Sequence, residues 1–249
     1  MVKIDRLWAS FIFFTRLPLW KVKEVDSECF KHVVPYWPMV GWLTGGVMAG
    51  VLWITGQFLP LSVAWLLAIV VRMLLTGCLH EDGLADFMDG FGGGMNRERI
   101  LSIMKDSHIG TYGVIALIVY VLLLWQVHLV PLSTLCLWVL CGDTFCKACT
   151  AQIINFLPYA RKEEESKSKV IYHGMTTFEK IFSVVIGALP LCLLPSHFLV
   201  ATVAPVLVVI LLARYIYKRI QGYTGDCCGA LFLLSEMSFY FVCLIIYHM

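Results

Sequence analysis

The chain has 249 residues, of which 59% are hydrophobic and only 14% are charged, with a formal net charge of +2. Soluble domains are nearer about 45–50% apolar and about 25% charged. The composition therefore excludes an ordinary soluble domain and predicts an all-α, polytopic integral membrane protein. The net charge is less informative than where the basic residues lie, and no nucleic-acid partner is expected. The ten cysteines lie scattered along apolar runs, where cysteine behaves as a small buried hydrophobe.

The first 35 residues combine basic side chains with tryptophan and phenylalanine. This pattern is typical of an amphipathic helix at the membrane interface, here ended by Pro18. It is equally expected of a basic flank that precedes the first membrane span.

Seven apolar segments follow, separated by prolines or by polar stretches. Each is long enough or apolar enough to be predicted as a membrane-spanning helix. The segments are about 38–59, 61–79, 112–130, 132–155, 181–195, 198–216 and 229–247.

Several of these segments contain charged residues, which inside a membrane usually face protein or water. Arg72 is expected either to pair with an acid near His80 or to extend its charge to the interface. Asp143 and Lys147 are four residues apart, so an intrahelical ion pair is favoured over a role in binding substrate. Glu236 lies in the last segment.

Lys and Arg favour the cytoplasmic side of a membrane. They are concentrated in the N-terminal region and near 80–111, 156–180 and 214–228, and are absent from the turns at 60–61, 130–133 and 195–198. Seven spans with a cytoplasmic N-terminus satisfy every loop. One domain covering 1–249 is expected, with the acidic segment after residue 79 and the loops near 161 and 226 at the same cytoplasmic face.

The most informative stretch is residues 80–113, which is acidic within an otherwise apolar chain. Asp82, Asp86 and Asp89 fall at i, i+4 and i+7, which places them on one face of a helix. Three carboxylates on one face repel one another, so the spacing predicts a bound cation. Oxygen ligands favour Mg²⁺, which binds through carboxylates together with substrate phosphates.

The residues after this helix suggest a site for phosphate groups. Backbone at Gly90–Gly94, including Gly92 and Gly93, can approach a ligand closely. Asn96 is a predicted N-cap of a short helix running to about Ser107. Arg97, Arg99 and Lys105 can neutralise phosphate charge, and one carboxylate can accept the proton of an attacking hydroxyl.

Two classes of membrane protein fit these residues: a phosphotransferase acting on a nucleotide-activated substrate, and an ion- or proton-coupled transporter. Transporters usually bind near the midplane of the membrane, at broken helices. Here most acids lie at the end of a span beside glycines and basic residues, which favours the enzyme.

The chain resembles the adenosylcobinamide-GDP ribazoletransferase (cobalamin synthase) family over almost its whole length. The resemblance is carried by 13–18 (FFTRLP), 80–90 (HEDGLADFMDG), 103–107 (IMKDS), 109–113 (IGTYG), 159–161 (YAR), 225–230 (GDCCGA) and Glu236.

The resemblance implies a multi-pass enzyme of a prokaryotic cell membrane with its active site on the cytoplasmic face. It joins adenosylcobinamide-GDP to α-ribazole or its 5′-phosphate, gives adenosylcobalamin or its phosphate, and releases GMP. Mg²⁺ is the implied cofactor. Further copies of the chain, in a homo-oligomer, and other enzymes of the corrinoid pathway are the expected protein partners.

Mapped onto this chain, the resemblance assigns roles to particular residues. Asp82, Asp86 and Asp89, with Glu81, are expected to hold Mg²⁺. Lys105, Arg99 and Arg161 are expected to hold phosphates, and Asp106 or Asp226 to orient the nucleophile or a second ion. The list of expected catalytic residues is Asp82, Asp86, Asp89, Lys105 and Asp106.

The sequence departs from the family pattern at three places: His108 and Lys147 stand where the family often has Arg, and 162–166 (KEEES) replaces a glycine-containing stretch. A CDP-alcohol phosphatidyltransferase-like enzyme is the alternative. That family places Ala-Arg shortly after its first Asp-Gly, whereas here Ala85 is followed by Asp86.

Overall fold

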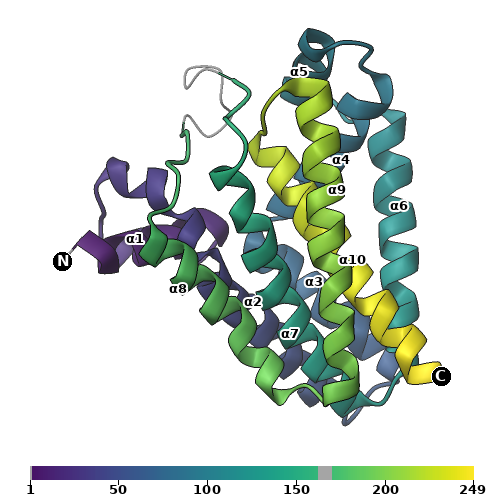
Figure 1. Cartoon of the computed structure of the whole chain (residues 1–249). Helices are drawn as coiled ribbons and strands as arrows, with labels where there is room; N and C mark the ends of the chain where they lie inside the picture. Colours follow the sequence, from purple (N-terminus) through teal and green to yellow (C-terminus); the bar gives the residue numbers. More distant parts are fainter. Residues whose placement is uncertain (1, 162–169) are drawn as a thin grey trace.

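The computed structural model describes residues 2–161 and 170–249, and this part of the chain is almost entirely helical (Figure 1). Ten α-helices follow one another: α1 (Val2–Phe14), α2 (Trp37–Thr55), α3 (Leu61–Thr76), α4 (Leu79–Gly93), α5 (Arg97–Lys105), α6 (Thr111–Trp125), α7 (Leu132–Ala151), α8 (Thr177–Ala188), α9 (Val203–Ile220) and α10 (Gly225–His248).

Short 3₁₀ turns extend or connect these helices. They are η1 (Leu19–Lys21), η2 (Ser27–His32), η3 (Val34–Tyr36), η4 (Gln126–Leu129), η5 (Gln152–Asn155), η7 (Leu189–Leu193) and η8 (Ser196–Thr202). The expected all-α class is confirmed.

The bundle is organised around α7 and α10. Helix α7 packs against α2, α8 and α10, while α10 packs against α4, α7 and α9. Glycines allow the closest of these approaches: a Cβ on Gly41 would lie 2.8 Å from Cα of Thr144, so α2 and α7 meet backbone to backbone. Helix α1 lies beside this bundle, at the end of the chain marked N in Figure 1.

Five helices are long and apolar enough to cross a membrane: Val34–Thr55, Thr111–Leu129, Leu132–Asn155, Ser196–Ile220 and Gly225–His248. The pair formed by α3 and α4 passes the same test together but is bent by 87°, which makes six if it is one span. The structure thus has a polytopic character without confirming seven spans. The predicted span at 181–195 falls on α8, which has only 12 residues, and η7.

Large apolar side chains remain exposed along several helices, among them Leu67 and Val70 on α3, Ile118 and Leu122 on α6, and Leu211 on α9. Apolar surface of this extent would be a liability in water, and a surrounding lipid phase accounts for it.

Candidate active site

The turn between α3 and α4 is built from left-handed backbone. Gly77 ends α3 with φ 64°, and Cys78 follows with φ 57°. A Cβ on Gly77 would lie 2.1 Å from Nε of Arg16, and the amide of Arg16 donates to the carbonyl of Leu75 at 2.7 Å. The segment that contains Arg16 therefore packs directly on the turn.

Helices α4 and α10 cross at two glycines. A Cβ on Gly83 would lie 3.0 Å from the carbonyl oxygen of Asp226 and 3.3 Å from Cα of Gly229. This close crossing brings the first turn of α10, where Asp226 lies, beside Asp82 on α4. The side chain of Thr224 begins α10 by accepting from the amide of Cys227 at 3.3 Å.

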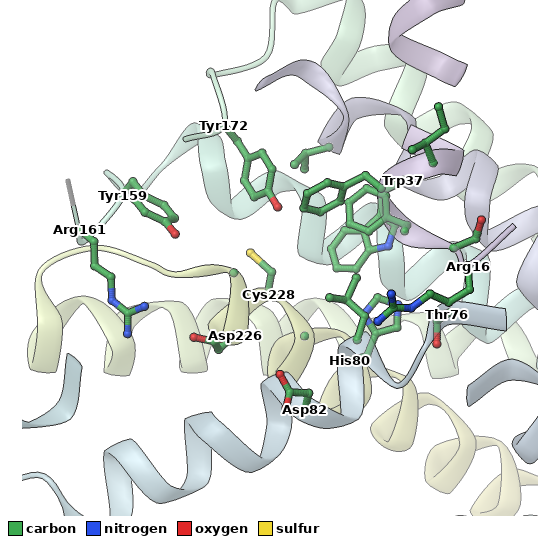
Figure 2. Close-up of a pocket in the computed structure, with 18 of the residues that line it drawn as sticks. Arg16, Trp37, Thr76, His80, Asp82, Tyr159, Arg161, Tyr172, Asp226 and Cys228 are labelled. Carbon is green, nitrogen blue, oxygen red and sulfur yellow. The ribbon is translucent and has the colours of Figure 1, made fainter. Parts of the chain in front are cut away.

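A pocket of about 660 Å³ opens above this crossing. Figure 2 shows Asp82 and Asp226 at its floor, Arg161 at one end and Arg16 at the other. Six aromatic side chains also line the pocket, together with His80: Phe13, Phe14, Trp20, Trp37, Tyr159 and Tyr172. The pocket thus combines hard carboxylate oxygens, two guanidinium groups and flat apolar walls.

Arg161 is positioned by the loops around it. It is 8% exposed, and one of its terminal nitrogens donates to the carbonyl of Leu101 at 2.9 Å. Arg97 donates to the carbonyls of Ala160 at 2.8 Å and Ile220 at 2.9 Å. The predicted gathering of the acidic segment with the loops near 161 and 226 is confirmed, and Arg97 serves to hold these loops together.

Asp89 is bound by backbone rather than directed into the larger pocket. Its two carboxylate oxygens accept from the amides of Gly110 at 2.7 Å and Gly113 at 2.9 Å, at the start of α6. A Cβ on either glycine would lie 2.4–2.5 Å from an Asp89 oxygen. The 109–113 motif therefore supplies the backbone amides that bind Asp89. The negative carboxylate is also stabilised by the positive end of the α6 dipole.

A second, smaller pocket of about 300 Å³ is lined by Asp89, Gly93, Arg99, Asp106 and His108, among others. The predicted site residues are thus divided between two pockets. Asp106 and His108 are exposed and contact each other at 2.6 Å. Hydrogen bonding to His108 lowers the pKa of the Asp106 carboxyl, and hydrogen bonding to Asp106 raises the pKa of the His108 imidazole.

The glycine run after Asp89 is used mainly for packing. A Cβ on Gly92 would lie 2.8 Å from the ring of Tyr112, and one on Gly90 would lie 2.4 Å from the side chain of Met104. Asn96 is the N-cap of α5 as predicted, accepting from the amide of Arg99 at 2.9 Å. Lys105, at the end of α5, is exposed and lines neither pocket.

Glu81 points away from Asp82 into a buried ionic cluster. Its carboxylate is 3.9 Å from Arg72, and both of its oxygens are buried without a hydrogen-bond partner among the described residues. Arg72 bonds both oxygens of Glu236 at 2.7 Å and the hydroxyl of Tyr120 at 2.7 Å. Of the two alternatives expected for Arg72, pairing is the one observed: Glu81, next to His80, lies 3.9 Å away, and Glu236 is bonded more closely.

The same cluster includes the ion pair predicted within α7. Lys147 bonds the carboxylate of Asp143, which also accepts from the hydroxyl of Thr44 at 2.7 Å, and lies 3.7 Å from Arg72. Asp143 and Glu236 are the charged residues that would suit a transporter. In this structure their charges instead pair with cations and hold α2, α3, α7 and α10 together.

The carboxylates suit a hard cation that also binds substrate. Asp82 is exposed to the larger pocket, Asp86 follows one turn later with 8% exposed, and Asp226 lies at the pocket floor. Within the described residues, the acids of α4 do not form a group of three ligand atoms. This arrangement fits Mg²⁺, which is usually held by one or two carboxylates and completed by substrate phosphates and water.

Sequence reasoning missed the aromatic walls of the larger pocket. Phe13 and Arg16 could have been found from the 13–18 motif, whereas Tyr172 comes from a loop with no motif of its own. The departure at 162–166 lies outside the described residues. Of the other two departures from the family pattern, Lys147 belongs to the buried ionic cluster and His108 lines the smaller pocket.

Comparison with known proteins gives a consistent result. Residues 6–244 match the model of a family described as cobalamin-5-phosphate synthase. Among curated relatives, adenosylcobinamide-GDP ribazoletransferases from Shewanella baltica strain OS185 and Shewanella sp. strain W3-18-1 are 39% and 40% identical, over 98% of this chain and 95% of theirs. The protein of that name from Shewanella oneidensis is 37% identical over the same shares. No solved structure matches. The chain belongs to the cobalamin-5-phosphate synthase family.

Proposed function

We propose that the chain is a membrane-bound transferase that completes the nucleotide loop of cobalamin. It joins adenosylcobinamide-GDP to α-ribazole, or to α-ribazole 5′-phosphate, and yields adenosylcobalamin, or its 5′-phosphate, and GMP. The observation that carries this proposal is the pocket above the crossing of α4 and α10. It holds Asp82, Asp226, Arg16 and Arg161 inside aromatic walls, in a chain of this family.

The pocket supplies groups for each part of such a reaction. A ribazole hydroxyl forms a new P–O bond to the phosphate attached to cobinamide, and the P–O bond to the departing GMP breaks. Asp226 is placed to accept the hydroxyl proton, and Arg161 and Arg16 to neutralise phosphate oxygens. The flat aromatic walls offer packing surface to the large rings of the substrates.

We assign the cofactor Mg²⁺ to Asp82 and Asp86, completed by substrate oxygens. When bound, the ion supplies positive charge that stabilises the diphosphate and the leaving GMP. Asp89 and Glu81 are left out of this ligand set, because Asp89 binds the start of α6 and Glu81 faces Arg72.

Arg99, Gly93 and Asp106 are assigned instead to the smaller pocket beside α5. Lys105, exposed at the end of the same helix, offers a charge at the surface near it. These residues suit contacts with those parts of a phosphate-bearing substrate that extend beyond the larger pocket.

The proposed location is the cytoplasmic membrane of a prokaryote, with both pockets on the cytoplasmic side. The support is the gathering of the Lys- and Arg-rich segments at the end that carries the pockets. Association with further copies of the chain or with other enzymes of the corrinoid pathway stays a prediction.

The decisive experiment is a turnover assay on the purified protein in liposomes, with adenosylcobinamide-GDP and α-ribazole, following GMP and cobalamin. We expect Mg²⁺-dependent product formation, reduced at least about 100-fold by Asp82→Asn and by Asp86→Asn, because a charge stabilising the transition state is lost. Membrane insertion is expected to be retained.

Glu98→Gln is the matched control, because Glu98 is exposed on α5 and lines neither pocket. Unchanged turnover in Asp82→Asn would remove this residue from the metal site. Absence of any cobalamin from well-folded wild-type protein would refute the proposed reaction itself.

A further inference from the structure

A second group of metal-ligating side chains lies outside both pockets. Glu28, His32 and His173 each offer a ligand atom, and these atoms all lie within 4.8 Å of one another. Within the described residues, no other group of three or more His, Cys, Asp or Glu residues meets this criterion. Nothing in the proposed reaction uses these three residues.

The group joins two segments that are far apart in sequence. Glu28 and His32 lie on η2, whose first turn is capped by Asp26, which accepts from the amide of Glu28 at 2.8 Å. His173 comes from the loop before α8, and its amide donates to the carbonyl of Lys31 at 2.9 Å. This backbone bond fixes the two segments in register and sets the imidazole rings 5.0 Å apart at 89°.

We propose that Glu28, His32 and His173 bind a borderline divalent transition-metal ion of the zinc type. Two imidazole nitrogens and one carboxylate oxygen form the ligand set of many three-residue zinc sites, with water in the fourth position. Mg²⁺ is disfavoured here, since it prefers oxygen ligands alone.

The local charges are compatible with such an ion. Of the three ligands, His32 is partly buried, whereas Glu28 and His173 are exposed. Lys31 contacts one carboxylate oxygen of Glu28 at 2.9 Å, which leaves the second oxygen for a metal.

The bound ion would act on the larger pocket through the neighbouring residue. Tyr172 lines that pocket and packs against Phe13 with ring centroids 5.9 Å apart, and Phe13 packs against Phe30 of η2. A metal bridge between His173 and η2 would therefore hold Tyr172 in the pocket wall. Its role would be structural and distinct from that of Mg²⁺.

The test is zinc binding by the full-length protein in detergent, treated with a chelator and then kept in excess Mg²⁺ without substrates. We expect one tightly bound zinc per chain after free metal is removed. His32→Ala and His173→Ala should weaken binding by at least about 100-fold, since even residues behind the ligands contribute roughly 10–100-fold to affinity.

His197→Ala is the matched control, because His197 is exposed and lies outside the group. Glu28→Gln is the variant least able to disturb folding, since Glu28 is exposed, and it should also weaken binding. Zinc binding unchanged in His173→Ala and Glu28→Gln would overturn the proposal, as would an equal loss in His197→Ala.

Two further measurements distinguish this site from the ten cysteines. Co²⁺ in place of zinc should give visible d–d bands without a thiolate charge-transfer band. A thiolate charge-transfer band that persists in all three variants would show that cysteines bind the metal, and would refute the assignment. Zinc should also slow amide hydrogen exchange at 170–176 in the wild type and not in His173→Ala. All these readouts are independent of turnover.

Discussion

Asp82 and Asp89 show how two residues of the same type on one helix acquire different functions. Asp82 is exposed to the larger pocket, whereas both oxygens of Asp89 are occupied by the amides of Gly110 and Gly113. Helical spacing places the two side chains on a common face but does not say what faces them. That depends on α6, which packs against the far end of α4.

Replacement of Asp89 by Ala should therefore act mainly by lowering the free energy of unfolding, and not by removing a group that takes part in the reaction. Two hydrogen bonds to a charged group are lost, each worth about 1.5–3 kcal/mol. Asp89→Asn keeps one acceptor oxygen and should lose less. Thermal unfolding in detergent provides the measurement. Full stability of Asp89→Ala combined with complete loss of turnover would instead place this carboxylate in the reaction.

The pair formed by Asp106 and His108 should have a measurable pH signature. Its favourable interaction is present between the lowered pKa of Asp106 and the raised pKa of His108. It is lost as pH rises through the latter or falls through the former. Asp106→Asn should move the pKa of His108 downward, as seen by NMR titration of labelled histidine. An unchanged titration of His108 would show that the pair does not form in solution.

At the scale of elements, the position of the pocket follows from the crossing of α4 and α10. Gly83 and Gly229 let the two backbones touch, so the start of α10 is seated against the first turns of α4. Asp82 on α4 and Asp226 in the first turn of α10 then share one pocket floor. A larger residue at the crossing would separate them.

Gly83→Ala tests this crossing. The new Cβ would lie 3.0 Å from the backbone oxygen of Asp226, which cannot move aside as a side chain would. We expect a loss of roughly 1–3 kcal/mol in unfolding free energy and a reduced turnover number. Gly46→Ala is the control, because a Cβ there meets nothing within 4 Å and should stabilise the helix slightly. Equal behaviour of the two variants would contradict the importance of the crossing.

Sequence reasoning succeeded for elements whose signals are local. The predicted span at 132–155 coincides with a candidate span, and the cap at Asn96 is present. It did not foresee the bend of 87° between α3 and α4, because a left-handed turn at Gly77 and Cys78 depends on Arg16 packing over it. The division of the site residues between two pockets likewise depends on contacts between distant helices.

For the whole molecule, the buried ionic cluster links the membrane helices to the site. Arg72 on α3 pairs with Glu236 on α10, and both are almost completely buried. Burying charges carries a desolvation penalty, which is offset only while the partners remain in place. The sequence predicted separate ion pairs for Arg72 and for Asp143 with Lys147. It did not predict that these pairs join into one buried cluster that also includes Glu81.

Arg72→Met should therefore be strongly destabilising, by about 3–5 kcal/mol, because Glu236 is left buried without its cation. The double variant Arg72→Met/Glu236→Leu should recover part of this loss. A double-mutant cycle from unfolding in detergent provides the measurement. Strictly additive losses would show that the two charges do not interact.

Helix α3 is shorter than a full membrane crossing. Its 16 residues rise about 24 Å, less than the roughly 30 Å of a bilayer's hydrocarbon core. Apolar side chains such as Leu67 and Leu74 face outward along it, and the chain turns at Gly77 before a full crossing is made. Because α3 ends before a full crossing, the bend of 87° that follows turns α4, with Asp82 of the pocket floor, across the end of α3 instead of continuing its axis.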